Sequence, residues 1–284
     1  MAIIVGSLAG QNWHRQVRQK NLTGQARFDY VVEKTVAAAR TFGFRPMGID
    51  LGVAALPSTD RGYLDELKHR FQENNLLPMI GFGQVACHYD SEVREVVRKQ
   101  ALANLDIAAY LGAKVSNFGC QRNGRVTRAG QVRFAIEELK VVGAEARRLG
   151  LKICQENFDY WTADELIEMS VGTGLDNVGI NNDTGNWLIT GEDPVVATEK
   201  VLPYTFHTHV RDYVLEEGTY NGVAVGEGLV DFERLLPILA KSGDKQDIFF
   251  SIEVDTDNRD EDQAFDNSCR YLKAWLTRHG HMTA

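Results

Sequence analysis

The sequence has little of several features that would assign it quickly to a class. Its four cysteines, Cys87, Cys120, Cys154 and Cys269, form no CxxC pair, so neither a zinc knot nor a disulfide framework is predicted. No apolar run approaches the roughly 18 residues that a transmembrane helix needs. The N-terminal AIIVGSLAG lacks the basic residues and the length of a signal peptide. We therefore expect a cytoplasmic protein in a reducing compartment, with no membrane partner.

The chain also lacks an excess of positive charge. It has 31 Lys and Arg against 39 Asp and Glu, a net charge of -8. A nucleic-acid partner calls for a basic patch, so this class of partner is disfavoured. The GxGxxG turn of a dinucleotide-binding sheet is missing too, because GSLAGQNW at 6–13 lacks that spacing.

What the chain does have is a regular alternation of short apolar runs and helix-like segments. The eight apolar runs span 2–9, 46–53, 76–83, 113–119, 151–158, 177–183, 205–210 and 247–255. The helix-like segments span 27–43, 63–75, 93–112, 134–150, 163–171, 194–202, 232–243 and 261–280. Strict alternation of this length predicts an α/β fold, a (β/α)8 TIM barrel over a single domain, residues 1–284. An open doubly wound sheet is the competing architecture.

Four predicted strands end in a polar, metal-ligating residue, and function in a barrel sits at this carboxyl-end rim. These residues are Glu156, Asp183, His209 and Glu253. Side chains alternate along a strand, and in each strand the polar residue lies opposite its apolar neighbours. In the strand at 205–210, for example, His207 and His209 share one face and Phe206 takes the other. The pattern predicts that all four polar side chains point into the barrel mouth.

Three carboxylates and an imidazole at one place would repel one another unless a cation lay between them. Oxygen-rich ligation with one histidine suits a divalent ion, with Mn²⁺ ahead of Mg²⁺, Co²⁺ or Zn²⁺. Taken singly, each acidic residue has the blander interpretation of a helix cap or an arginine partner, and an inward histidine that of a structural residue. Their joint position at one rim favours the metal site.

Five segments carry a family resemblance. They are ICQENFDY at 153–160, INNDTGNW at 180–187, HTHVRDY at 207–213, VGEGLVDF at 225–232 and FFSIEVD at 249–255. In this order and spacing the chain resembles the xylose isomerase-like barrel superfamily of sugar isomerases and epimerases, which also contains endonuclease IV. The likeness is densest from 150 to 254, and the first half agrees only in its strand-helix rhythm.

The resemblance implies one divalent metal held by Glu156, Asp183, His209 and Glu253. It also implies that Glu156 and Glu253 are the acid-base pair, as in ketose epimerases of this type. Two positions depart from the family, because Phe158 and Asn186 stand where many relatives have a histidine. A mechanism that uses either histidine is not transferred, which disfavours DNA repair and weakens a dehydratase assignment.

Further rim residues are candidates for contact with substrate. Trp13, Trp161 and Trp187 follow predicted strands, so we expect their rings at the mouth, where they would face a sugar or simply pack loops. We expect His207 either to hydrogen-bond a substrate hydroxyl or to lie behind the metal ligands and hydrogen-bond one of them. Arg211, in place of the family's usual lysine, holds a substrate oxygen or pairs with an acidic neighbour. The predicted substrate-binding residues are His207, Arg211, Trp13, Trp187 and Asn186.

An arginine-bearing loop at 121–128 adds Arg122, Arg125 and Arg128 near the rim. They would meet a phosphate or carboxylate on the substrate, or form an ordinary solvated charge run.

These residues predict a metal-dependent isomerase or epimerase that moves a proton next to the carbonyl of a small sugar or polyol derivative. One alternative is a lyase, dehydratase or deglycosidase that uses the same metal. Another is a sugar-binding protein without turnover, or a subunit of a hetero-complex. Relatives suggest a homodimer or homotetramer, and the sequence does not name the sugar.

Overall fold

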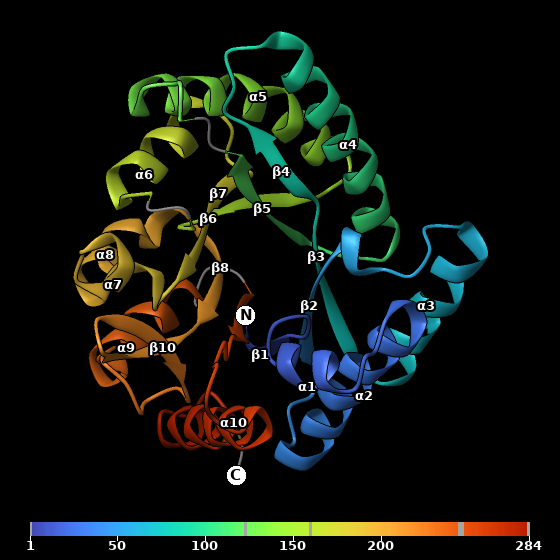
Figure 1. Ribbon diagram of the computed structural model, residues 1–284, viewed down its shortest axis with the longest axis vertical. Helices are drawn as coiled ribbons and strands as arrows, with labels where there is room; N and C mark the ends of the chain where they lie inside the picture. The colour runs from blue at the N-terminus through green and yellow to red at the C-terminus, as the bar shows by residue number, and fades with distance from the viewer. Residues whose placement is uncertain (1, 122–123, 159–160, 244–246, 283–284) are drawn as a thin grey trace.

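Parallel strands form a central barrel that helices surround on all sides (Figure 1). The computed structural model describes residues 2–121, 124–158, 161–243 and 247–282. The strands are β1 Ile3–Leu8, β2 Met47–Gly52, β3 Leu76–Gly81, β4 Gly83–Ala86, β5 Val115–Gln121, β6 Lys152–Glu156, β7 Val178–Asp183, β8 Thr205–Val210, β9 Asp212–Glu216, β10 Thr219–Val223 and β11 Ile248–Ile252. The helices are α1 His14–Gln19, α2 Gly24–Phe42, α3 Arg61–Glu73, α4 Ser91–Tyr110, α5 Arg128–Arg148, α6 Ala163–Gly172, α7 Asn186–Thr190, α8 Pro194–Val201, α9 Phe232–Gly243 and α10 Glu261–Arg278.

The barrel closes where β3 is followed directly by β4. The sheet order is β3-β2-β1-β11-β8-β7-β6-β5-β4, so the two edge strands of the sheet, β3 and β4, follow each other in the chain. Between them the Phe82 amide donates to the Asn117 carbonyl at 3.1 Å, and Gly83 takes φ +107°, which a side chain would disfavour. β3 and β4 thus act as one bent barrel strand, and the predicted (β/α)8 barrel is confirmed.

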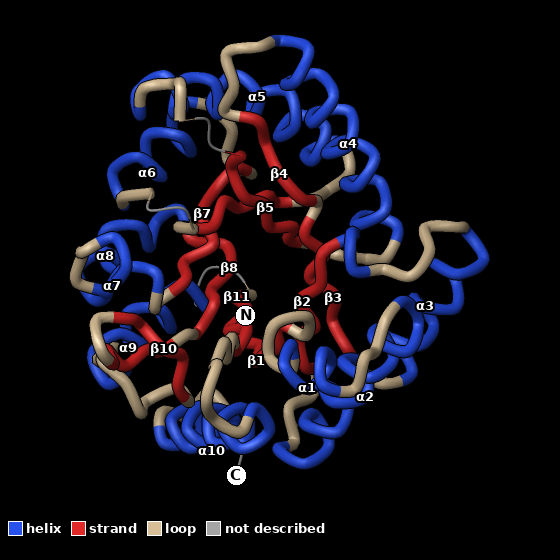
Figure 2. Tube along the Cα trace, viewed as in Figure 1, coloured by secondary structure: helices blue, strands red, loops and turns tan. Residues whose placement is uncertain are grey.

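Helices cover the outer face of the barrel (Figure 2), so apolar side chains on this face are removed from water. Phe250 and Ile252 of β11 are fully buried on this side. Two helices begin at the residues that the sequence indicates. Thr162 and Glu165 form a reciprocal capping box at the start of α6, and the Asp193 side chain accepts from the amides of Val195 and Val196 at the start of α8.

One predicted side-chain direction is wrong. The pairing of β7 with β8 shifts between Ile180 and Asn181, whose partners are Thr205 and His207, so Phe206 is skipped by an irregularity. Phe206 packs inside the barrel against Met79, Val115 and Cys154 instead of facing the helices. His207 and His209 keep their predicted inward direction above it.

The structure adds elements that the alternating pattern did not predict. Among them are the short helices α1 and α7, the 3-10 helices at Val53–Ala55 and Leu202–Tyr204, and the antiparallel β9–β10 hairpin. No helix in the described part of the chain combines the length and the apolar character needed to cross a bilayer.

Candidate metal centre

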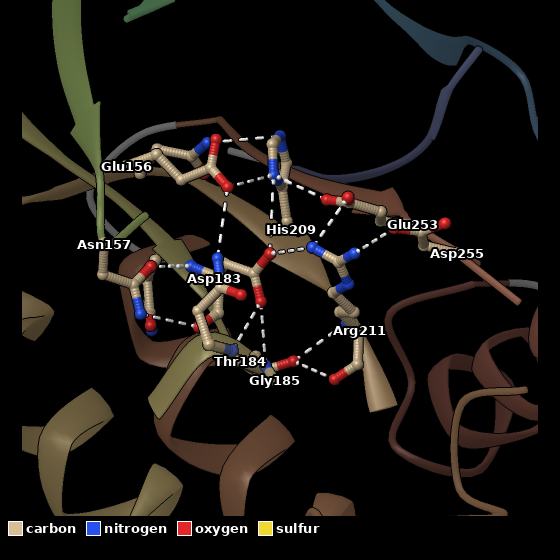
Figure 3. Close-up of polar contacts among 12 residues, drawn as sticks. Glu156, Asn157, Asp183, Thr184, Gly185, His209, Arg211, Glu253 and Asp255 are labelled. Atoms are coloured by element: carbon tan, nitrogen blue, oxygen red, sulfur yellow. Dashed lines mark hydrogen bonds and ion pairs between the residues drawn. The ribbon is translucent and has the colours of Figure 1, made fainter. Parts of the chain in front are cut away.

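Four side chains from neighbouring strands meet at the carboxyl end of the barrel (Figure 3). Glu156, Asp183, His209 and Glu253, here called the rim quartet, each offer one ligand atom, and these atoms lie within 4.8 Å of one another. His209 Nδ1 lies 3.6 Å from Glu156 Oε1, 3.8 Å from Asp183 Oδ2 and 3.1 Å from Glu253 Oε2. The predicted convergence of the four residues is therefore present in the structure.

The rim quartet carries more negative charge than its surroundings balance. Arg211 supplies one cation, with Nη1 at 2.8 Å from Glu253 and 3.4 Å from Asp183. Burial raises the pKa of Asp183 to about 7; the Arg211 charge opposes this rise, and the carboxylates of Glu253 and Glu156 add to it. The raised pKa means that the ionised carboxylate is unfavourable in this site, so a further positive charge there would stabilise it.

The unpaired atoms of the rim quartet fit a metal ion. His209 Nδ1 and Glu253 Oε2 are both buried, and although they lie 3.1 Å apart, neither makes a hydrogen bond. Buried polar atoms without a partner are costly, and a cation shared among them would satisfy both. Three carboxylates and one imidazole are a donor set suited to Mn²⁺, Mg²⁺, Co²⁺ or Zn²⁺.

Backbone and side-chain contacts hold Asp183 in place. Asn157 donates through Nδ2 to the Asp183 carbonyl at 2.9 Å and accepts from the Asp183 amide at 2.8 Å. The amides of Gly185 and Asn186 donate to Asp183 Oδ1 at 2.9 and 3.0 Å. With one oxygen fixed by the turn, the other is left facing His209.

A second acidic and histidine cluster lies on the other side of the same imidazole. Asp50, at the end of β2, places Oδ2 at 3.0 Å from His209 Nε2 and 3.2 Å from His207 Nε2. All three residues are at most 1 % exposed, and their ligand atoms also lie within 4.8 Å of one another. Sequence reasoning missed Asp50, although its position opposite Ile49 and Leu51 carries the same alternation signal as the rim quartet.

A pocket of about 460 Å³ opens above the rim quartet. Its lining residues are Leu8, Gln11, Asp50, Gly52, Asn117, Glu156, Phe158, His209, Arg211, Glu253 and Asp255. Arg211 is thus at the predicted place, and its Nη2 lies 2.9 Å from Asp255. Asn186 reaches the site indirectly, by donating to Glu156 Oε1 at 3.3 Å, and His207 lies fully buried beside Asp50.

Of the two roles expected of the tryptophans, substrate contact and loop packing, the structure shows packing. Trp13, Trp161 and Trp187 are at most 1 % exposed and do not line the pocket. Trp13 packs on Phe265 of α10, and Trp187 donates to Asn182, whose side chain faces the helices. The loops that carry these rings turn them into the strand-helix layer, where the apolar area is buried. Among the described residues, Phe158, 56 % exposed, is an aromatic residue that lines the pocket.

Among the loop arginines that the structure describes, Arg128 is engaged away from the pocket. Arg128 pairs with Glu165 and lies over the Trp161 ring, with 4.3 Å between the guanidinium carbon and the ring centroid. Arg122 lies outside the described residues.

Comparisons with known proteins agree with this architecture. A solved D-psicose 3-epimerase from Clostridium cellulolyticum H10, crystallised with D-tagatose, is 16% identical, with a TM-score of 0.74 over 96% of this chain and 99% of that one. A xylose isomerase-like TIM barrel protein from Mycobacterium smegmatis in complex with magnesium is 20% identical, with a TM-score of 0.69 over 98% and 97%. The IOLI protein with a bound zinc atom is 15% identical, with a TM-score of 0.70 over 88% and 93%.

At these identities the likeness shows the fold alone. No curated protein matches the chain. The family model described as xylose isomerase-like TIM barrel matches residues 36–275, which is most of the chain. The chain therefore belongs to the xylose isomerase-like TIM barrel family.

Proposed function

We propose that this protein is a divalent-metal-dependent isomerase or epimerase of a small sugar or polyol derivative. The single observation that carries the proposal is the rim quartet, three carboxylates and one imidazole whose ligand atoms lie within 4.8 Å of one another, with Glu156, His209 and Glu253 lining an open pocket. Mn²⁺ is the proposed ion, with Mg²⁺, Co²⁺ and Zn²⁺ as alternatives. The solved relatives with zinc and with magnesium support a metal in this family of barrels.

A bound divalent ion would polarise a substrate carbonyl and so acidify the neighbouring C–H. The proton transfer itself is assigned to the two glutamates. β7 and β8 lie between β6 and β11 in the sheet, so Glu156 and Glu253 approach the pocket from either side of Asp183 and His209. One carboxylate removes the proton; the other returns it in an epimerisation, and a single carboxylate serves both steps in an isomerisation.

The two glutamates are held differently. Glu253 is almost fully buried, beside His209 and Arg211. Glu156 retains 21% side-chain exposure and accepts one hydrogen bond, from Asn186. Glu156 is therefore the carboxylate with more freedom to reach a substrate carbon.

The cellular setting and assembly remain parts of the proposal. All four cysteines are buried and free, which supports a reducing, cytoplasmic setting. A homodimer or homotetramer stays a prediction.

The test begins with elemental analysis of the purified protein, followed by deuterium wash-in from D₂O on a panel of keto-sugars and inososes. We expect exchange at the carbon next to the carbonyl, abolished by a chelator and restored by Mn²⁺. A product with a new ultraviolet absorption would instead identify a lyase, because elimination creates conjugation. Tight metal binding without exchange into any substrate would favour a binding protein or an incomplete hetero-complex.

A further inference from the structure

Asp50 lies directly behind the histidine of the rim quartet. Its Oδ2 is 3.0 Å from His209 Nε2, the ring nitrogen that points away from Glu156, Asp183 and Glu253. Asp50 is 1 % exposed, so water does not compete for this contact. The two ring nitrogens of His209 therefore face two separate groups of carboxylates.

A neutral imidazole has one N–H and one lone pair, and its hydrogen-bond partners decide which nitrogen carries which. A carboxylate accepts only, so contact with Asp50 favours the N–H on Nε2. The lone pair is then on Nδ1, which has no hydrogen-bond partner and faces the three carboxylates of the rim quartet. This is the arrangement that a metal ligand needs.

One neighbour has to be compatible with this tautomer. Asn181 places Nδ2 at 3.2 Å from His209 Nε2, while its Oδ1 has no partner. The two ends of an amide are equivalent in shape, so a half-turn presents the unpartnered oxygen to the Nε2–H. Asn181 then supports the same tautomer.

Asp50 is itself held rigidly. His207 Nε2 approaches the same carboxylate oxygen at 3.2 Å, and its ring stands at 89° to the ring of His209. The Asp50 carbonyl accepts from the Ala9 amide at 3.1 Å, which ties the end of β2 to the end of β1. A fixed acceptor fixes the ring plane of His209 as well as its tautomer.

We propose that Asp50 is a positioning residue for metal binding, which holds His209 in the tautomer and orientation that direct the Nδ1 lone pair into the rim quartet. The inference rests on the proposed function through the metal site alone. Loss of such a partner behind a metal ligand lowers metal affinity by about 10- to 100-fold. An ion bound instead between Asp50, His207 and His209 Nε2 is the competing arrangement, and it requires the opposite tautomer.

The test is Asp50→Asn, which keeps the shape of the side chain and replaces an acceptor-only group by one that also donates. An amide N–H turned toward Nε2 favours the lone pair there and moves the proton to Nδ1, toward the metal. An amide oxygen turned toward Nε2 is uncharged and a weaker acceptor than the carboxylate, so in either orientation the Nδ1 lone pair is held less firmly. We expect Mn²⁺ affinity at constant pH, measured by electron paramagnetic resonance of the free ion, to fall by about 10- to 100-fold. Unchanged affinity would overturn the proposal.

A second measurement reads the tautomer directly and does not depend on the variant's folding. The carboxylates around His209 raise the pKa of its ring well above the usual value, so the metal-free protein is measured at a pH high enough for the ring to be neutral. Long-range ¹⁵N–¹H correlation of ¹⁵N-histidine-labelled wild-type protein, metal-free at that pH and loaded with Zn²⁺, is expected to give His209 protonated at Nε2 in both states. The His209 signals are assigned by their loss in His209→Gln. A wild-type His209 protonated at Nδ1, or a zinc ion on Nε2, would overturn the proposal.

Asp255→Asn is the matched control. It removes the same charge from the same pocket but contacts Arg211 rather than His209. We expect the Nε2–H tautomer to be kept and metal affinity to change far less than in Asp50→Asn. Equal losses of metal affinity in both variants would mean that only the removed charge matters, and would contradict a positioning role for Asp50. If the wild-type protein binds no divalent ion, the proposed function fails, while the metal-free tautomer still decides the role of Asp50.

Discussion

The two halves of the barrel contribute differently to the pocket. The C-terminal half, β6, β7, β8 and β11, supplies the rim quartet. The N-terminal half is tightly packed: a Cβ on Gly48 would lie 2.9 Å from the Phe249 ring, and one on Gly81 would lie 2.2 Å from Asn117 Oδ1. The C-terminal half is therefore called the donor half, and the N-terminal half, where glycines stand at positions with no room for a side chain, the narrow half. Asp50 is the exception, an acidic side chain from the narrow half that reaches across to His209.

The largest effect is expected from the donor half. Glu156→Gln and Glu253→Gln keep the size of the side chain but remove the base, so deuterium exchange into the substrate should fall by about 10²- to 10⁴-fold. Circular dichroism should show an intact fold. Glu227→Gln, at an exposed glutamate within 225–232, is the control and should exchange at the wild-type rate. Wild-type exchange in either rim variant would refute the acid-base assignment.

The narrow half should respond through stability. Gly48→Ala forces its methyl group against the Phe249 ring and the Gly6 backbone, and overpacking of this kind costs about 1–3 kcal/mol of unfolding free energy. Gly119→Ala is matched to it, because Gly119 lies on another barrel strand, β5, and its Cβ would meet nothing within 4 Å. Denaturant titration of both variants measures the difference. Equal stability of the two would show that the inner face of β2 has spare room.

The same division explains which parts of the site the sequence predicts. Alternation along 177–183 and 247–255 is local information, because each strand shows by itself which face is polar. The positions of Asp183 and Glu253 at the inward rim therefore follow from the sequence alone. Asp50 shows the same alternation, but no recognisable motif surrounds it in the first half of the chain.

Other features depend on pairing between elements and leave no local signal. The irregular register of β7 and β8 turns Phe206 inward, and nothing within 205–210 indicates it. The direction of Trp13 and Trp187 depends on how α1 and α7 turn after their strands, which the strand-helix alternation does not specify. Chain segments that are short and irregular are thus the least predictable part of the rim.

A third prediction concerns pH and the charge balance of the donor half. The pKa of Asp183 is raised from 3.8 to about 7 in the folded protein, so its protonated form stabilises the metal-free fold. This contribution is complete below the unfolded value and is lost as the pH rises through about 7. The thermal midpoint of metal-free protein should therefore fall between about pH 5 and about pH 7, and then level off, relative to that of Asp183→Asn, which does not titrate. Parallel curves for the two proteins would contradict a raised pKa.

The smallest effect tests whether the donor half also contacts the substrate through an apolar surface. Phe158 follows Glu156 closely, lines the pocket and is 56 % exposed, so its ring is available to the C–H face of a sugar. Such a contact contributes about 0.5–1.5 kcal/mol, so Phe158→Ala should raise KM by about 2- to 10-fold and leave metal affinity unchanged. Phe158→Tyr retains the ring and should restore the wild-type KM. Phe158 is not a member of the rim quartet. A fall in kcat without a change in KM would therefore assign it to the chemistry of the donor half rather than to substrate binding. That result would remove the distinction between the carboxylates, which react, and the ring, which only contacts substrate.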